Sequence, residues 1–95
     1  MSLHSVPPGV SQLFGKNLRQ RWEEGGLTQE ELGLISSLHR TEIGQLERGL
    51  RLPRIDTLIK LAAALKVSPM DLLAGIDWQP GHVSITKGSF QMPSD

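Results

Sequence analysis

The chain of 95 residues has no cysteine, few aromatic residues and no long apolar run. The lack of cysteine excludes both a disulfide framework and a thiolate metal site. No stretch approaches the length needed to cross a membrane, and the first ten residues lack the basic start and apolar run of a secretory signal. These absences predict a cytoplasmic protein with one small domain and no membrane contact.

Neither sign of charge is in excess, since ten Lys and Arg residues balance ten Asp and Glu residues. Because phosphate neutralisation supplies much of the affinity for DNA, this balance by itself argues against a nucleic-acid partner. The distribution is uneven, however. Residues 39–54 contain four arginines and two glutamates, whereas residues 28–38 contain two glutamates and no basic residue. Positive charge therefore collects around one segment.

Clusters of the kind that enzymes use are also missing from the sequence. There is no nucleophile–base pair, no cluster of metal ligands and no phosphate-cradling glycine loop. His4 and His82 stand in unpatterned segments, and the carboxylates are spread as helix caps and surface charges. We therefore expect a protein that is not an enzyme and has no catalytic residue, cofactor or metal site.

Helix-start and helix-stop signals divide the middle of the chain into short helices. Ser11 is a plausible cap for the first helix, whose apolar residues recur every three or four positions until a pair of glycines ends it. Thr28, followed three positions later by Glu31, forms the capping-box pattern that starts the second helix. After a short turn, His39 is expected to cap a third helix of about residues 39–48.

Two further helices complete the pattern. The fourth begins at Ile55, and its apolar spacing marks it as the centre of the core. Ser68 and Asp71, with a proline between them, start the fifth. We expect a flexible arm over residues 1–10, a helical domain over residues 11–75 and a tail over residues 76–95.

The tail differs from the helices in its pattern. Residues 83–86 alternate apolar and polar side chains as a β-strand does. Because a lone strand is not stable in water, three outcomes remain open for this segment. It can pack on the helices, pair with a second copy of the chain, or stay disordered.

One ordered set of residues extends through the last four helices. The set comprises Gly26 to Leu32, Ile43, Leu46 to Gly49, Pro53, Asp56 to Leu58, Leu61, Ala62, Leu65 and Val67 to Pro69. In order and spacing it resembles the lambda-repressor-like, Cro-type family of helix-turn-helix regulators, often called XRE-type. The resemblance covers about residues 14–75. It implies an all-α, five-helix DNA-binding domain with a non-helical C-terminal tail.

In such regulators the third helix enters the major groove of DNA and the second helix spans the backbone. The positions that match base-contacting residues of the family are Arg40, Thr41, Glu42 and Gln45. The positions that match phosphate-contacting residues are Thr28, Gln29, His39, Arg48 and Arg51. Arg40 has the donors for guanine and Gln45 the pattern for adenine, and we expect Glu42 to orient Arg40.

The resemblance also implies a function and a partner. It predicts a transcriptional regulator, a repressor, that binds double-stranded DNA as a homodimer on a palindromic operator. We expect the dimer contact to involve Met70, Leu72, Leu73 and the tail. The alternative is an antitoxin that binds a toxin protein, or another protein-binding adaptor, on the same fold. The zero net charge keeps that alternative open.

The chain departs from the family pattern at three positions. Many relatives have an arginine where this chain has Trp22, and that arginine pairs with the glutamate equivalent to Glu47. Either Trp22 covers Glu47 and Arg21 swings across to it, or Glu47 finds another partner. Ser37 replaces a usual glycine in the turn, which predicts a slightly different turn geometry, and Gly33 replaces a usual alanine. A helix glycine costs up to ~1 kcal/mol relative to alanine, so we expect a close helix–helix approach at Gly33.

Overall fold

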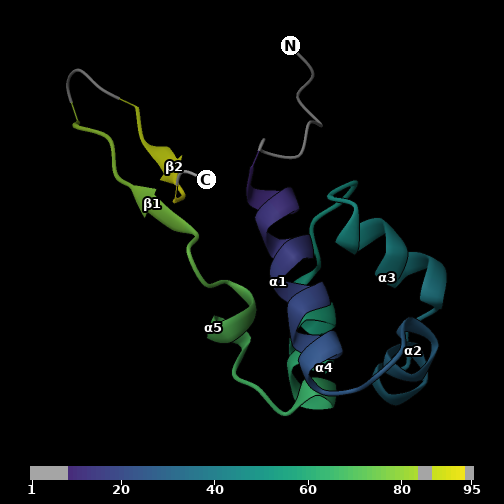
Figure 1. The fold of residues 1–95 in the computed structure, drawn as a ribbon. Helices are drawn as coiled ribbons and strands as arrows, with labels where there is room; N and C mark the ends of the chain where they lie inside the picture. The colour runs from purple at the N-terminus through teal and green to yellow at the C-terminus, as the bar shows by residue number, and fades with distance from the viewer. Residues whose placement is uncertain (1–8, 84–86, 94–95) are drawn as a thin grey trace.

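The computed structural model describes residues 9–83 and 87–93 as five α-helices followed by a small β-hairpin (Figure 1). The predicted all-α, five-helix domain is confirmed. Residues 1–8, which make up most of the expected arm, lie outside the described residues. The elements are α1 (Val10–Glu24), α2 (Gln29–Ser36), α3 (Arg40–Glu47), α4 (Ile55–Leu65), α5 (Pro69–Leu72), β1 (Asp77–Gln79) and β2 (Ser89–Gln91).

Helix α1 begins two residues earlier than its predicted cap implied. Gly9 is its cap, with φ at +87°, and the Gly9 N–H donates a hydrogen bond of 2.7 Å to Oε1 of Gln12. Ser11 is buried inside the first turn and is not the cap. Val10, which was expected in the arm, is also buried and belongs to α1.

The core lies where α1, α3 and α4 meet and is closed by one residue each from α2 and α5 (Figure 1). Its fully or almost fully buried apolar residues are Phe14, Leu18, Leu32, Ile43, Leu46, Leu61, Ala62 and Leu72. Burying each large side chain of this kind stabilises the fold by roughly 1.5–3 kcal/mol. Ile55 was expected on the inward face of α4, but it is 78% exposed, and the buried face of that helix begins at Thr57.

The turn between α2 and α3 keeps a left-handed residue although it has no glycine. Ser37 has φ +58° and ψ +40°, the left-handed conformation that glycine adopts readily. Ser36 is buried and Ile35 is exposed. A Cβ on Gly33 would lie 2.7 Å from the carbonyl oxygen of Leu38. The nearest contact at Gly33 is therefore with the turn, and helix α3 also lies close, since the same Cβ would be 3.5 Å from Cδ1 of Ile43 and 3.6 Å from N of Arg40.

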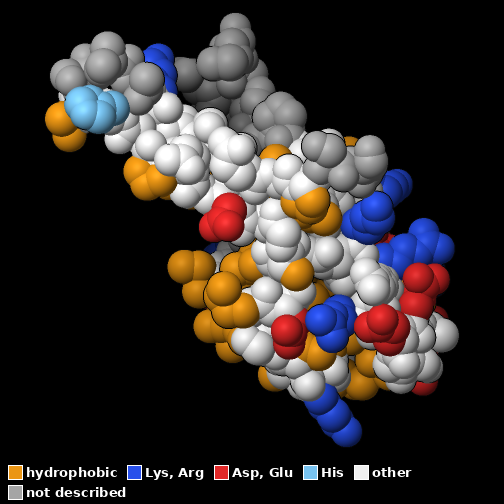
Figure 2. Space-filling view, turned by 60° about the vertical axis from the view of Figure 1, so that its left-hand side comes forward, with side chains coloured by type: hydrophobic (Ala, Val, Ile, Leu, Met, Phe, Trp, Pro, Cys, Tyr) orange, Lys and Arg blue, Asp and Glu red, His pale blue; other side chains and the backbone are white. Residues whose placement is uncertain are grey.

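Several large apolar side chains stay outside the core. Along α4, Ile55, Ile59 and Ala63 are exposed at intervals of four residues, so they form one stripe on the helix. Met70 of α5 is also 71% exposed. Figure 2 shows hydrophobic side chains gathered on the side of the domain below the hairpin. This apolar surface lacks a partner within the part of the chain that the structure describes.

The tail forms a hairpin of its own. Strands β1 and β2 are antiparallel, with Trp78 opposite Phe90. Their rings form an edge-to-face pair with centroids 4.9 Å apart at 71°, a favourable arrangement of two aromatic rings. Of the expected strand at residues 83–86, residues 84–86 lie outside the described residues. Val83 is fully exposed and belongs to neither strand.

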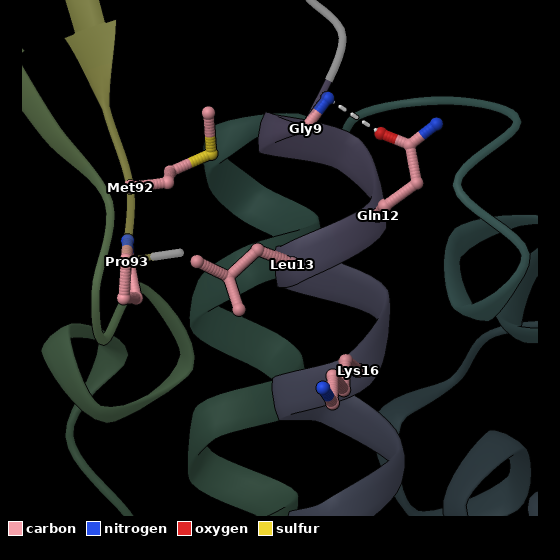
Figure 3. A pocket seen from close by; sticks show the side chains of 6 residues that line it. All are labelled: Gly9, Gln12, Leu13, Lys16, Met92 and Pro93. Atoms are coloured by element: carbon pink, nitrogen blue, oxygen red, sulfur yellow. Dashed lines mark hydrogen bonds between the residues drawn. The ribbon is translucent and has the colours of Figure 1, made fainter. Parts of the chain in front are cut away.

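The end of the tail returns to the first helix. Met92 and Pro93 lie beside Leu13 at the start of α1, where they enclose a shallow pocket (Figure 3). A Cβ on Gly75 would lie 3.3 Å from both Leu13 Cδ2 and Pro93 Cδ, which shows how closely these segments approach. The described tail therefore pairs with itself and packs on the helices, one of the three outcomes left open by its sequence.

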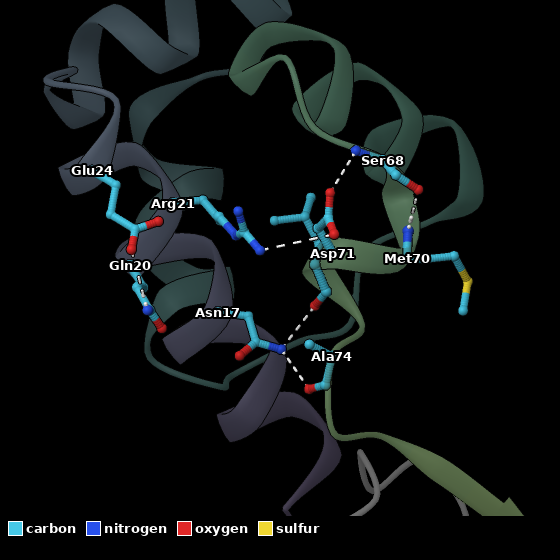
Figure 4. Close-up of polar contacts among 9 residues, drawn as sticks. Asn17, Gln20, Arg21, Glu24, Ser68, Met70, Asp71 and Ala74 are labelled. Carbon is cyan, nitrogen blue, oxygen red and sulfur yellow. Dashed lines mark hydrogen bonds and ion pairs between the residues drawn. The ribbon is translucent and has the colours of Figure 1, made fainter.

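Polar contacts from α1 hold the short helix α5 in place (Figure 4). Nδ2 of Asn17 donates to the carbonyl oxygens of Leu72 at 3.1 Å and of Ala74 at 2.9 Å. Arg21 and Asp71 form an ion pair at 3.8 Å. In this position Leu72 has no exposed surface. The prediction that Leu72 contributes to a dimer contact is therefore wrong, because its side chain fills the core.

Candidate nucleic-acid interface

Two buried residues anchor α3 and determine which of its sides faces outward. Ile43 and Leu46 have no exposed surface, whereas Arg40 and Thr41 are exposed. His39 caps the helix, because its Nδ1 accepts a hydrogen bond of 3.1 Å from the Thr41 N–H. The predicted helix and its cap are therefore confirmed, and the side opposite the core presents polar residues to solvent.

The start of α2 lies next to this outward side. Thr28 Oγ1 accepts from the Glu31 N–H at 3.1 Å, and Glu31 Oε1 accepts from the Thr28 N–H at 2.9 Å. The predicted capping box is thus present in both directions. The Thr28 hydroxyl keeps its proton for a further acceptor, and the helix start has a partial positive charge that favours anions.

An open cleft of about 510 Å³ joins α1, α2 and α3. Four of the nine predicted contact residues line it: Gln29, Arg40, Thr41 and Arg48. The other lining residues are Arg19, Gly44 and Glu47. Arg19 was missed because only its place on the polar side of the first helix was apparent from the sequence. The cleft therefore combines three arginines with one carboxylate.

The remaining predicted residues lie away from the cleft lining. Near the end of α3, Oε1 of Gln45 accepts a hydrogen bond of 3.2 Å from Nη1 of Arg51. A residue expected to read bases and one expected to bind phosphate are therefore bonded to each other. Arg48, which does line the cleft, makes a local contact as well, since its Nε donates a hydrogen bond of 3.2 Å to the Gly44 carbonyl oxygen.

The expectation that Glu42 orients Arg40 is wrong. Neither side chain has an ion-pair or hydrogen-bond partner among the residues that the structure describes. Arg54, in contrast, forms an ion pair with Asp56 at 3.3 Å, which fits a solvated surface role. The guanidinium group of Arg40 is left exposed and able to reach a ligand.

The carboxylate of Glu47 accepts hydrogen bonds from two neutral side chains. Nε1 of Trp22 donates to Oε2, and Nε2 of Gln29 donates to Oε1 at 2.5 Å. Of the two alternatives left open by the sequence, the structure shows the second, because Glu47 has partners other than Arg21, namely Trp22 and Gln29. Arg21 does not swing across to Glu47, because it pairs with Asp71 instead.

Other kinds of site find no support within residues 9–83 and 87–93. No group of three or more potential ligand side chains is close enough together to hold a metal ion. Over the same ranges, every helix is too short or too polar to cross a membrane. The cleft beside α3, with four of the nine predicted contact residues, is therefore the candidate site.

Comparison with known proteins matches residues 16–72 to the helix-turn-helix family HTH_3. The chain is 44% identical over 65 residues to control protein C.BamHI of Bacillus amyloliquefaciens, an alignment that covers 67% of this chain and 80% of the relative. The crystal structure of the restriction-modification controller protein C.AhdI from Aeromonas hydrophila is similar, with 39% identity and a TM-score of 0.64 over 65% of this chain and 94% of that one. The P22 c2 repressor protein, in complex with the synthetic operator 9T, matches with 34% identity and a TM-score of 0.63, covering 67% of this chain and 97% of its own.

The matched region has clear limits in the fold. It begins within α1 and ends at Leu72, the last residue of α5, so it contains the whole motif and excludes the hairpin. Both the arrangement of α2 and α3 and these similarities indicate a helix-turn-helix motif. The chain therefore belongs to the helix-turn-helix family HTH_3 of DNA-binding transcriptional regulators.

Proposed function

We propose that this protein is a repressor that binds a palindromic operator as a homodimer, with α3 in the major groove of each half-site. The observation that carries the proposal is the division of α3 into a buried side, with Ile43 and Leu46, and an exposed side, with Arg40 and Thr41. A helix anchored in this way can enter a groove without disturbing its own core.

Base readout is assigned to the exposed side of α3. Arg40 stands in the first turn, unpaired among the described residues, and can donate two hydrogen bonds to the edge of guanine. Thr41 can offer its hydroxyl to a base or its methyl to thymine. Gln45 can bond adenine through both ends of its amide only after Arg51 releases its Oε1. Glu42 lies beside them and can accept from cytosine.

Backbone contacts are assigned to the residues around that helix. Arg48 and Gln29 line the cleft, and the exposed Arg51, Thr28 and His39 lie at the edges of the motif. Because the whole chain is neutral, long-range attraction to DNA is weak, and affinity must come from this local set of donors. Such contacts position the protein and carry no direct sequence information.

A second copy of the chain would bind the other half-site of the operator. One small module buries too little surface for tight specific binding. The exposed stripe with Ile55 and Ile59 on α4, and the exposed Met70 on α5, offer apolar area for a two-fold contact. Leu73 is half-buried at the edge of the core, and we assign it and the hairpin that follows it to the same contact.

Selection of bound sites from random DNA tests the DNA part of the proposal and yields the operator. With that operator, Arg40→Ala should weaken specific binding by roughly 5- to 150-fold and leave non-specific binding almost unchanged, since one base contact discriminates by ~1–3 kcal/mol. Gln45→Ala should behave in the same way. Arg48→Ala should weaken binding to all sequences and reduce the salt dependence. An equal loss on every sequence from Arg40→Ala would show that Arg40 contacts phosphate.

Light scattering after size exclusion tests the dimer. Ile59→Arg should convert the dimer to a monomer, because it places a charge in the apolar stripe. Leu34→Arg is the matched control, since Leu34 is a 76% exposed apolar residue on α2. A strict monomer for the unmodified chain, even with DNA present, would defeat the dimer proposal.

A further inference from the structure

The Glu47 carboxylate joins three helices at the cleft. Glu47 is the last residue of α3, Trp22 belongs to α1 and Gln29 is the first residue of α2. Both donors to the carboxylate are neutral, so this contact is not an ion pair. The Arg19 guanidinium carbon lies 6.0 Å from the centre of the Trp22 ring, which completes a chain of contacts along the cleft.

We propose that Glu47 is a positioning residue that sets the direction of the Gln29 side-chain amide, so that Gln29 offers an N–H donor to a DNA phosphate. A carboxylate can only accept hydrogen bonds, whereas an amide has one end that donates and one that accepts. Glu47 therefore requires the nitrogen of Gln29 to turn toward it. That nitrogen has two hydrogens, and only one of them is used by Glu47.

Trp22 leaves one oxygen of the Glu47 carboxylate available to the Gln29 side chain. The indole has a single N–H, which binds Oε2 and leaves Oε1 for the amide. An arginine in place of Trp22 would present a fork of donors that matches both carboxylate oxygens. It would then compete with Gln29 for Oε1. The orientation of Gln29 thus depends on Trp22 as well as on Glu47.

The charge of Glu47 has a second effect, which any test must separate. The carboxylate lines the same cleft as Arg19, Arg40 and Arg48, and it repels phosphate. Removing it raises DNA affinity through charge while it lowers affinity through loss of orientation. A single variant cannot distinguish these two effects, but a double-mutant cycle can, because the charge effect is the same in both backgrounds and cancels.

The inference rests on the proposed DNA binding. The experiment measures both the DNA affinity and the coupling between Gln29 and Glu47. Wild type and the Gln29→Ala, Glu47→Gln, Trp22→Arg and Gln45→Ala variants are titrated with one duplex of arbitrary sequence at low salt, since phosphate contacts do not need the operator. Gln29→Ala is also combined with Glu47→Gln and with Trp22→Arg, and Gln45→Ala with Glu47→Gln. Gln29→Ala should weaken binding about tenfold in the wild type, as expected for a lost hydrogen bond to a charged group. In the Glu47→Gln and Trp22→Arg backgrounds the same change should cost less than about twofold. Gln45→Ala is the control and should show no coupling to Glu47→Gln.

Additive effects of Gln29→Ala and Glu47→Gln would overturn the positioning role and leave the proposed function standing. An NMR measurement on the free protein provides a readout without DNA. The side-chain amide protons of Gln29 should shift on Glu47→Gln, while the backbone spectrum stays native-like. An unchanged amide would also overturn the role. If the wild type bound no duplex, the proposed function would fail, and this NMR readout would still decide the positioning.

Discussion

Replacing Ser37 by glycine should stabilise the protein, although it removes a side chain. Ser37 has φ +58° and ψ +40°, a left-handed conformation that costs a residue with a Cβ about 1–2 kcal/mol. Glycine avoids that cost but loses about 0.5–1 kcal/mol more conformational entropy on folding. The hydroxyl of Ser37 is exposed and has no partner among the described residues. The expected net gain is therefore roughly 0.5–1 kcal/mol.

The neighbouring serine provides a control with the opposite sign. Ser36 is a buried helical residue, and its hydroxyl donates to the Leu32 carbonyl oxygen at 2.5 Å. Ser36→Gly loses that hydrogen bond and introduces a glycine into a helix, so it should cost ~1–2 kcal/mol. Thermal unfolding followed by circular dichroism should show a midpoint about 2–8 °C higher for Ser37→Gly and lower for Ser36→Gly.

The outcome also bears on the motif. Because the turn already has the conformation that glycine favours, Ser37→Gly should leave the crossing of α2 and α3 unchanged, and DNA affinity should stay within about twofold of the wild type. A lower melting temperature for Ser37→Gly would refute the assignment of backbone strain to this residue. A changed DNA affinity would show that the turn geometry of the Ser37→Gly variant differs from that of the wild type.

Three other glycine replacements test close contacts in the fold. Gly15→Ala should destabilise the domain in urea unfolding by at least ~1 kcal/mol, because its Cβ would lie 2.5 Å from the Leu46 carbonyl oxygen; a neutral result would contradict this packing. A Cβ on Gly44 would meet only open space, so Gly44→Ala should stabilise the domain by up to ~1 kcal/mol in the same assay. A loss of stability would contradict the open space at this position. Gly88→Ala should alter the near-ultraviolet circular dichroism of Trp78, because the new Cβ would collide with its ring, while the helical signal stays constant. A lost helical signal would show that the hairpin supports the core.

Interactions between near neighbours in the chain were predictable from the sequence. The capping boxes at Thr28 and Ser68 each join residues three positions apart, so their geometry follows from the helix itself. The three-residue spacing of Ile43 and Leu46, typical of one side of a helix, indicates the buried side of α3 in the same way. The sequence by itself therefore determines the order of the helices and the outward placement of Arg40 and Thr41.

Contacts between distant residues were decided by the tertiary structure alone. Glu47 receives its hydrogen bonds from Trp22 and Gln29, which are 25 and 18 positions away, and only the crossing of three helices brings them together. The inward direction of Leu72 follows from the docking of a four-residue helix against Asn17. Such contacts depend on small differences in helix angle, because a side-chain hydrogen bond forms only within a few tenths of an ångström. Sequence periodicity identifies the buried side of a helix, but the partner that covers it depends on the packing of the whole domain.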